Sequence, residues 1–266
     1  MTNPREPVEL SSSEGLTQEP TDLTSEEAPF VRMAADGLLR VGVPAWSASV
    51  AADAVTAHPR LTVPYVIAYS GELVADPICF VPDSRHHLKL SYQVPRPGDW
   101  VEGVLRARVR TNRKGQPQWR KLNTRRQWQA LTRLWCQVCG KSARDDRGRY
   151  PWIMTEKVFR WDEEQPDTII ASAPPTCWAC IPNALASCPQ LEDSSTAIYT
   201  AGGALPVGVL GDVYEPWFAS EVIPTTQRNV EVRFTQRSIL PSVLAHQLVV
   251  RVFDLRAVTA LGERAA

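Results

Sequence analysis

The 266-residue chain carries no formal net charge, because 29 lysine and arginine residues balance 29 aspartate and glutamate residues. This length is enough for one large domain or two small ones, and the zero net charge excludes any conclusion about a partner from overall charge alone. No apolar run of about 18 residues and no basic-then-apolar N-terminus is present, which argues against a membrane span and a signal peptide. We therefore expect a cytoplasmic protein whose cysteines do not form a disulfide framework.

The first 28 residues are rich in Ser, Thr, Glu and Pro and contain few large apolar side chains. Seven acidic residues stand there against one basic residue, Arg5. Such a segment cannot bury enough apolar surface to offset the entropy lost on ordering, so residues 1–28 are expected to form a disordered acidic tail.

Residues 29–195 are expected to form an α+β region. Runs rich in β-branched and aromatic residues occur at 63–69, 78–81 and 88–92, with turn sequences between or after them. This pattern predicts short strands in a small antiparallel sheet.

Residues 103–110 predict a strand that carries arginines. Apolar and basic side chains alternate along it, and a period of two puts the basic ones on one face. The basic residues are Arg106, Arg108 and Arg110, and the apolar ones are Leu105, Ala107 and Val109. A helix is then predicted from about Thr124, with an apolar stripe of Trp128, Leu131 and Trp135 that leads to Cys136.

The window from Gly103 to Arg144 contains twelve lysine or arginine residues and no aspartate or glutamate. This local excess favours binding of a polyanion such as nucleic acid, in which phosphates meet basic side chains and tryptophan stacks on an unpaired base. The predicted nucleic-acid-binding residues are Arg106, Arg108, Arg110, Arg113, Lys114, Trp119, Arg120, Lys121, Arg125 and Arg126. The alternative interpretation of the arginine strand is an edge strand kept soluble by its charge.

Two Cys-x-x-Cys pairs predict a zinc site. The ligands are Cys136, Cys139, Cys177 and Cys180. Four thiolates in two such pairs are the usual ligands of structural Zn²⁺, because a two-residue spacer lets one tight turn direct two sulfurs at one point. Gly140 supplies the permissive backbone that the first turn needs. A tight turn, a hairpin and a helix that begins at the second pair predict a treble-clef-like site, with the helix dipole stabilising the thiolates.

The same residues argue against several catalytic sites. A catalytic zinc keeps an open position, whereas four cysteines close the coordination shell. A nucleobase deaminase needs His-x-Glu upstream of its cysteines, and no histidine before the first pair is followed by Glu two residues later. No histidine lies between His87 and His246, which argues against a nuclease built on a treble clef. Cys79 and Cys188 are expected to be packed thiols outside the site.

Residues 196–260 predict a β-rich segment that packs on the same domain and ends in a helix. The helix is predicted after Ser238, because the apolar residues there follow a helical spacing. They are Leu240, Val243, Leu244, Leu248, Val252 and Leu255.

Residues 125–140, which end in Cys-Gln-Val-Cys-Gly, and residues 174–181, Pro-Pro-Thr-Cys-Trp-Ala-Cys-Ile, resemble a set of uncharacterised actinobacterial proteins. The resemblance extends over about residues 85–260 and includes Gly208–Pro216. It implies a zinc site and a GC-rich bacterial source, in line with 24 arginines against 5 lysines. It implies no activity.

The sequence thus predicts an α+β fold, with small antiparallel sheets around a treble-clef-like zinc site and with a C-terminal helix. The function it favours is binding of a polyanion, nucleic acid first, by a zinc-stabilised protein. Two alternatives stay open: a protein-interaction or scaffold module in which zinc only holds the fold, and an enzyme of unidentified chemistry.

Overall fold

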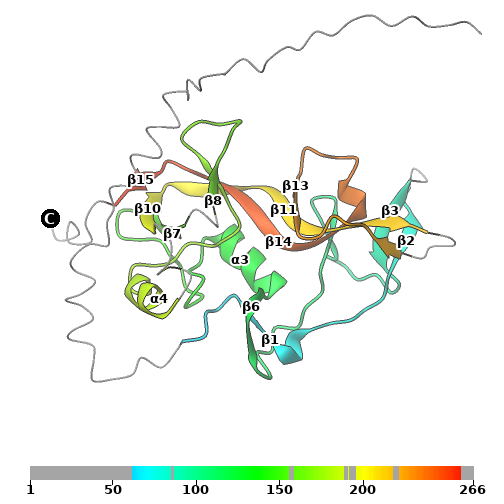
Figure 1. The fold of residues 1–266 in the computed structure, drawn as a ribbon, viewed down its shortest axis with the longest axis horizontal. Helices are drawn as coiled ribbons and strands as arrows, with labels where there is room; N and C mark the ends of the chain where they lie inside the picture. Colours follow the sequence, from blue (N-terminus) through cyan, green and yellow to red (C-terminus); the bar gives the residue numbers. More distant parts are fainter. Residues whose placement is uncertain are drawn as a thin grey trace, which may run out of the picture. The chain divides into compact units, whose positions relative to one another are not determined.

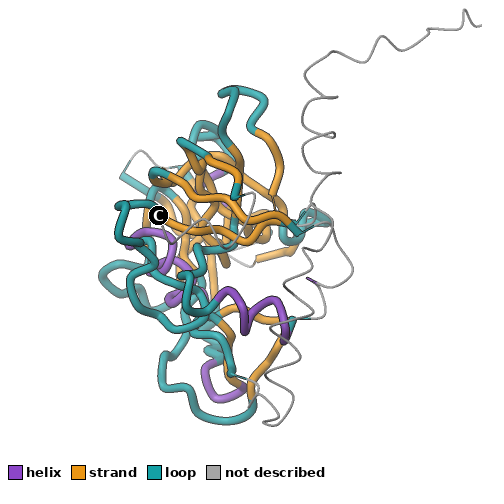
Figure 2. The backbone as a smooth tube through the Cα atoms, turned by 90° about the vertical axis from the view of Figure 1, so that its left-hand side faces the viewer, coloured by secondary structure: helices purple, strands orange, loops and turns teal. Residues whose placement is uncertain are grey.

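The computed structural model describes residues 62–84, 87–155, 159–188, 191, 196–217 and 222–258. The predicted acidic tail at 1–28 lies outside the described residues. Strands make up most of the regular structure, and the fold is of mixed α+β type as expected (Figure 2). No helix within the described ranges is long and apolar enough to cross a membrane.

Two long strands, β11 (Gly203–Pro216) and β14 (Val243–Phe253), form the centre of the largest sheet among the described residues. They pair antiparallel and run side by side in Figure 1. Strand β14 also pairs with β5 (Val104–Arg106) in parallel and with β9 (Ile169–Ala171) antiparallel. The sheet is completed by β4 (Trp100–Val101), β8 (Phe159–Trp161), β12 (Val222–Pro224) and β13 (Val230–Arg233). Strands from before, between and after the cysteine pairs therefore share one sheet.

Three smaller antiparallel sheets are formed by other strands among the described residues. In the first, strand β1 (Ile67–Tyr69) pairs with β6 (Pro117–Leu122). In the second, β2 (Ile78–Pro82) pairs with β3 (Leu88–Tyr92). In the third, β10 (Ala197–Ala201) pairs with both β7 (Tyr150–Met154) and β15 (Arg256–Ala257). The helical elements within the described ranges are α3 (Thr124–Arg133), α4 (Ile181–Ser187) and the 3-10 turns η1 (Ser70–Glu72) and η3 (Leu240–Ser242). The predicted strands at 78–81 and 88–92 are confirmed, whereas the first run is a strand only over its last three residues.

The predicted C-terminal helix is wrong, because most of its residues form strand β14, with Leu240 in η3 and Leu255 beyond the strand. Leu210 lies opposite Gln247 and Gly211 opposite Ala245, so His246 is an extra residue in β14. Such a β-bulge shifts the period-two alternation by one position and produces an apolar spacing that resembles that of a helix. The valines of β14 are β-branched and favour the extended backbone.

Strand β5 is shorter than the predicted arginine strand, and it does not alternate between apolar and basic faces. Val104 and Leu105 are both fully buried, each in a different hydrophobic core. Because β5 lies between β4 and β14 with a core on each face, two consecutive apolar residues are required there. Beyond Arg106 the chain leaves this sheet and crosses to β6, which pairs with β1.

Helix α3 begins where it is predicted. The side chain of Asn123 accepts a hydrogen bond from the backbone N–H of Arg126 and so caps the first turn. Trp128 and Leu131 are buried as expected. The helix ends at Leu134, whose backbone is left-handed (φ 53°), so the predicted stripe stops before Trp135.

Gln127 attaches α3 to β14. Its fully buried amide donates to the carbonyls of Ser172 (2.7 Å) and Leu248 (2.9 Å), and its oxygen accepts from the backbone N–H of Leu248 (2.9 Å). A buried amide with these partners is satisfied, and it fixes the register of the helix on the strand.

Glu72, at the end of η1, is a buried carboxylate that joins three segments of the chain. Only 1% of the residue is exposed. The Arg126 guanidinium donates to both oxygens, at 2.6 and 2.7 Å, and the Asn123 amide donates at 3.0 Å. The backbone N–H groups of Tyr69 and Arg113 complete the set at 2.9 Å each. Burial acts to raise the pKa of Glu72, but the Arg126 guanidinium and the other donors lower it to about 2.

The substitution Glu72→Gln should lower the free energy of unfolding by about 3–5 kcal/mol, because it leaves the Arg126 charge buried without a partner. Urea unfolding followed by circular dichroism measures this loss. Glu215→Gln removes the same charge from an exposed position and should change stability by less than about 0.5 kcal/mol. Equal losses in the two variants would show that Glu72 has no such role.

The contribution of Glu72 to stability should depend on pH. Its pKa is lowered in the folded protein from 4.5 to about 2, so the contribution is complete above the unfolded value and is lost as pH falls through this interval. The difference in unfolding free energy between wild type and Glu72→Gln should therefore shrink from about pH 6 to about pH 3. A difference that stays constant over this range would contradict the assignment.

Candidate metal centre and basic pocket

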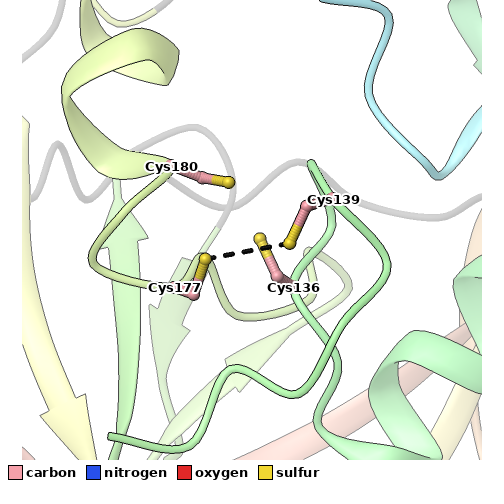
Figure 3. A group of neighbouring side chains, drawn as sticks. All are labelled: Cys136, Cys139, Cys177 and Cys180. Carbon is pink, nitrogen blue, oxygen red and sulfur yellow. Dashed lines mark hydrogen bonds between the residues drawn. The ribbon is translucent and has the colours of Figure 1, made fainter.

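The four predicted cysteine ligands meet at one point. The Sγ atoms of Cys136, Cys139, Cys177 and Cys180 all lie within 4.8 Å of one another, and the side chains point toward a common centre (Figure 3). The Cys139 and Cys177 sulfurs are 3.8 Å apart. Among the described residues no histidine, aspartate or glutamate belongs to the group. The donor set is therefore four thiols.

The first pair lies in a tight turn closed by backbone hydrogen bonds. The N–H of Val138 donates to the Sγ of Cys136 (3.4 Å), and the N–H of Gly140 donates to the Cys136 carbonyl (2.8 Å). Gly140 has φ +72°, and a Cβ at this position would lie 2.7 Å from the Tyr65 ring. Both the backbone angle and this close approach require glycine, as predicted.

The second pair lies immediately before α4, with Cys180 as the residue that precedes the helix. The two turns are also joined directly: the N–H of Gln137 donates to the Pro175 carbonyl (2.9 Å), and its side chain donates to the Thr176 hydroxyl (2.9 Å). Cys188, at the other end of α4, and Cys79 do not belong to the group. These hydrogen bonds hold the turns of the two cysteine pairs next to each other.

The four thiols lie so close together that they do not all ionise easily unless a cation is bound between them. Burial raises the pKa of Cys136 to about 11, and burial together with the neighbouring Cys177 thiol raises the pKa of Cys180. Burial acts in the same sense on Cys139, but the N–H of Lys141 and the surrounding thiols hold its pKa below the usual range. Because four thiolates this close repel one another, a divalent metal ion is what this donor set suits.

Two of the predicted nucleic-acid-binding arginines are held in ion pairs, Arg126 fully buried and Arg108 partly buried. Arg108 lies 2.6 Å from each of Asp76 and Asp99, and Arg126 lies 2.6 Å from Glu72. All three carboxylates come from residues before the acid-free window, so a count within the window does not reveal them. The charges of Arg108 and Arg126 are therefore neutralised inside the protein.

A third arginine, Arg106, is half-buried. Its guanidinium lies over the Trp128 ring (5.6 Å to the centroid) and donates to the Gly98 carbonyl (3.1 Å). The other predicted residues are exposed, namely Arg110, Arg113, Lys114, Trp119, Arg120, Lys121 and Arg125.

Trp119, Arg120 and Lys121 project from an irregularity in β6. Ile67 lies opposite Leu122 while its neighbour Ala68 lies opposite Gln118, so these three residues fall between the two paired stretches. Trp119 is 48% exposed.

Four of the predicted arginines line a single polar pocket of about 300 Å³: Arg106, Arg108, Arg110 and Arg125. The remaining charged wall residues are Asp76, Arg96 and Asp99, which sequence reasoning missed. Residues 96–99 are typical of a turn and carry no local signal of a binding site, because the pocket forms only when this turn packs against β5 and the start of α3.

Comparison with protein-family models, with curated proteins and with solved structures finds no match to this chain. Its function is therefore inferred from the two clusters described above, the four thiols and the basic residues around the pocket.

Replacing Cys136 or Cys177 with serine should abolish metal retention, because a hydroxyl is a much poorer ligand than a thiolate for a soft or borderline ion. Mass spectrometry of the purified protein should find about one ion per wild-type chain and almost none in either variant. The melting temperature should fall in parallel.

Cys79→Ser and Cys188→Ser are matched controls, since both cysteines are partly buried and lie outside the group. They should retain the wild-type metal content. Unchanged metal content and stability in both Cys136→Ser and Cys177→Ser would refute the metal site.

Proposed function

We propose that this chain is a zinc-stabilised protein that binds a polyanion, nucleic acid first, through exposed basic residues. The observation that carries the proposal is the exposure of six predicted basic residues whose side chains have no carboxylate within ion-pair distance among the described residues. They are Arg110, Arg113, Lys114, Arg120, Lys121 and Arg125. Unpaired cations of this kind can release counterions by contacting phosphates, which is the main source of affinity for nucleic acid.

The identity of the ion as zinc is supported by the sulfur spacing. A tetrahedral ion with metal–sulfur distances of about 2.3 Å has sulfurs about 3.8 Å apart. The Cys139 and Cys177 sulfurs have this separation. Four thiolates leave no open coordination position, so the role of zinc here would be structural.

The order of elements supports a treble-clef-like arrangement. The turn of the first pair is followed by the antiparallel pair β8 and β9, and the second pair leads into α4. In one respect the hairpin is more than a local element, because β9 also pairs with β14 of the large sheet. The zinc site would thus be anchored to the main core.

The turn of the first pair also positions the basic residues. The N–H groups of Tyr65 and Val66 donate to the carbonyls of Val138 and Gln137, and the Val66 carbonyl accepts from the N–H of Asn123. The segment that leads into β1 is therefore held between the metal centre and the N-terminus of α3. Loss of the metal would disturb the surface that carries Arg120 and Arg125.

Trp119 favours a strand with unpaired bases. Its ring is half exposed and stands next to Arg120 and Lys121. A base can stack on such a ring while the neighbouring cations contact the phosphates on either side, and this arrangement tolerates any sequence.

Titration with a single-stranded oligonucleotide of about 12 residues tests the proposal. The logarithm of the affinity should fall with the logarithm of salt concentration by roughly 0.7 per phosphate contact, or roughly 4 for six contacts. Arg120→Gln combined with Lys121→Gln should reduce this slope by about 1.4, and Trp119→Ala should weaken binding by roughly tenfold or more.

Arg237→Gln is the matched control, because it removes a charge from an exposed arginine in another part of the sequence. It should leave the slope unchanged. A flat salt response, or no binding by wild-type protein, would overturn the proposed function.

A further inference from the structure

The polar pocket carries a positive charge that its own acidic residues do not balance. Five arginines and two aspartates line it, which leaves a formal charge of +3 (five less two). Arg96 and Arg108 pair with the aspartates, Arg96 at 3.5 Å from Asp76 and Arg108 at 2.6 Å from both carboxylates.

The excess charge lies on Arg106, Arg110 and Arg125. None of the three has a carboxylate within ion-pair distance among the described residues. Burial, and then the charge of Arg125, lowers the pKa of Arg106. Arg106 and Arg125 line the same pocket, so their like charges repel each other, and an anion bound by both would relieve this repulsion.

The wall of the pocket is organised in advance. Arg106 is held by the Trp128 ring and by the Gly98 carbonyl. Arg108 donates to Asp99 through two nitrogens (3.0 and 2.6 Å) and to the Val94 carbonyl (2.8 Å). Because both aspartates are occupied by these bonds, their charge is largely neutralised toward an entering anion. A preorganised cationic site loses little entropy when it binds.

We propose that this pocket binds a phosphate monoester, with Arg106 and Arg125 contacting its oxygens and Arg110 at the rim. Guanidinium groups match phosphate oxygens with paired hydrogen bonds, and a monoester carries close to two negative charges at neutral pH. An internal phosphodiester carries only one negative charge, so it balances the three unpaired guanidinium groups less well.

The volume of about 300 Å³ is at the small end of the range for ligand pockets, enough for a phosphate and part of the sugar attached to it. Because Arg110 and Arg125 belong both to the pocket wall and to the exposed basic residues, the source that fits is the terminal phosphate of a nucleic-acid strand. This choice of source rests on the proposed function, whereas the anion site itself rests on the pocket alone.

Calorimetric titration with three versions of one oligonucleotide tests the inference: hydroxyl ends, a 5′-phosphate, and a 3′-phosphate. A phosphate at one end should strengthen binding by roughly 10-fold to 100-fold. Arg125→Gln, at an exposed position, and Arg106→Gln should abolish this gain. Arg120→Gln removes the same charge outside the pocket, so it should weaken all three strands alike and preserve the gain.

A parallel titration with a nucleoside 5′-monophosphate separates the possible sources of the phosphate. If strands bind without preference for a terminal phosphate and the monophosphate does not bind, the pocket inference is overturned and the proposed function stands. If the monophosphate binds and no strand does, and Arg106→Gln and Arg125→Gln both abolish that binding, the anion site is supported while the strand source and the proposed function are overturned. Absence of both kinds of binding rejects both proposals.

Discussion

The carboxylate of Glu72 and the guanidinium of Arg126 lie in the interior, where neither charge would be stable alone. Five hydrogen bonds converge on the two carboxylate oxygens from the end of β1, from the loop before β6 and from the N-cap and first turn of α3. Because the pair can form only when all three segments are in place, it couples the position of the helix to that of the loop. This arrangement fixes the backbone of Arg113 and of the first turn of α3. It therefore also positions the exposed residue Arg125, which lines the polar pocket.

Arginine serves two purposes in this region, and the difference lies in the carboxylates that each side chain meets. Arg108 and Arg126 are neutralised in ion pairs and stabilise the packing of distant segments. Arg106 and Arg125, only a few residues away in the sequence, have no such partner among the described residues and face the same pocket. A protein can keep unpaired cations this close when they remain partly hydrated or when an anion joins them.

The four-thiol group and the basic region are linked through the backbone. The residues that precede β1 hydrogen-bond to the turn of the first cysteine pair on one side and to the start of α3 on the other. Tyr65 packs against Gly140 in the same place, which is why a larger residue cannot stand there. A short path of backbone hydrogen bonds therefore connects the turn of the first cysteine pair to the start of α3.

Local features of the sequence were sufficient for several elements that depend on neighbouring residues. The spacing of the cysteines, the glycine behind the first pair, the strands β2 and β3 and the start of α3 near Thr124 are of this kind. The C-terminal strand could not be recognised, because a bulge at His246 shifts its apolar alternation toward a helical spacing. The ion pairing of Arg108 and Arg126 and the wall of the pocket were decided by the tertiary structure, since the partners Glu72, Asp76 and Asp99 lie in other elements of the chain. A charge count along the sequence cannot detect such pairs, because ion pairing depends on distance in space.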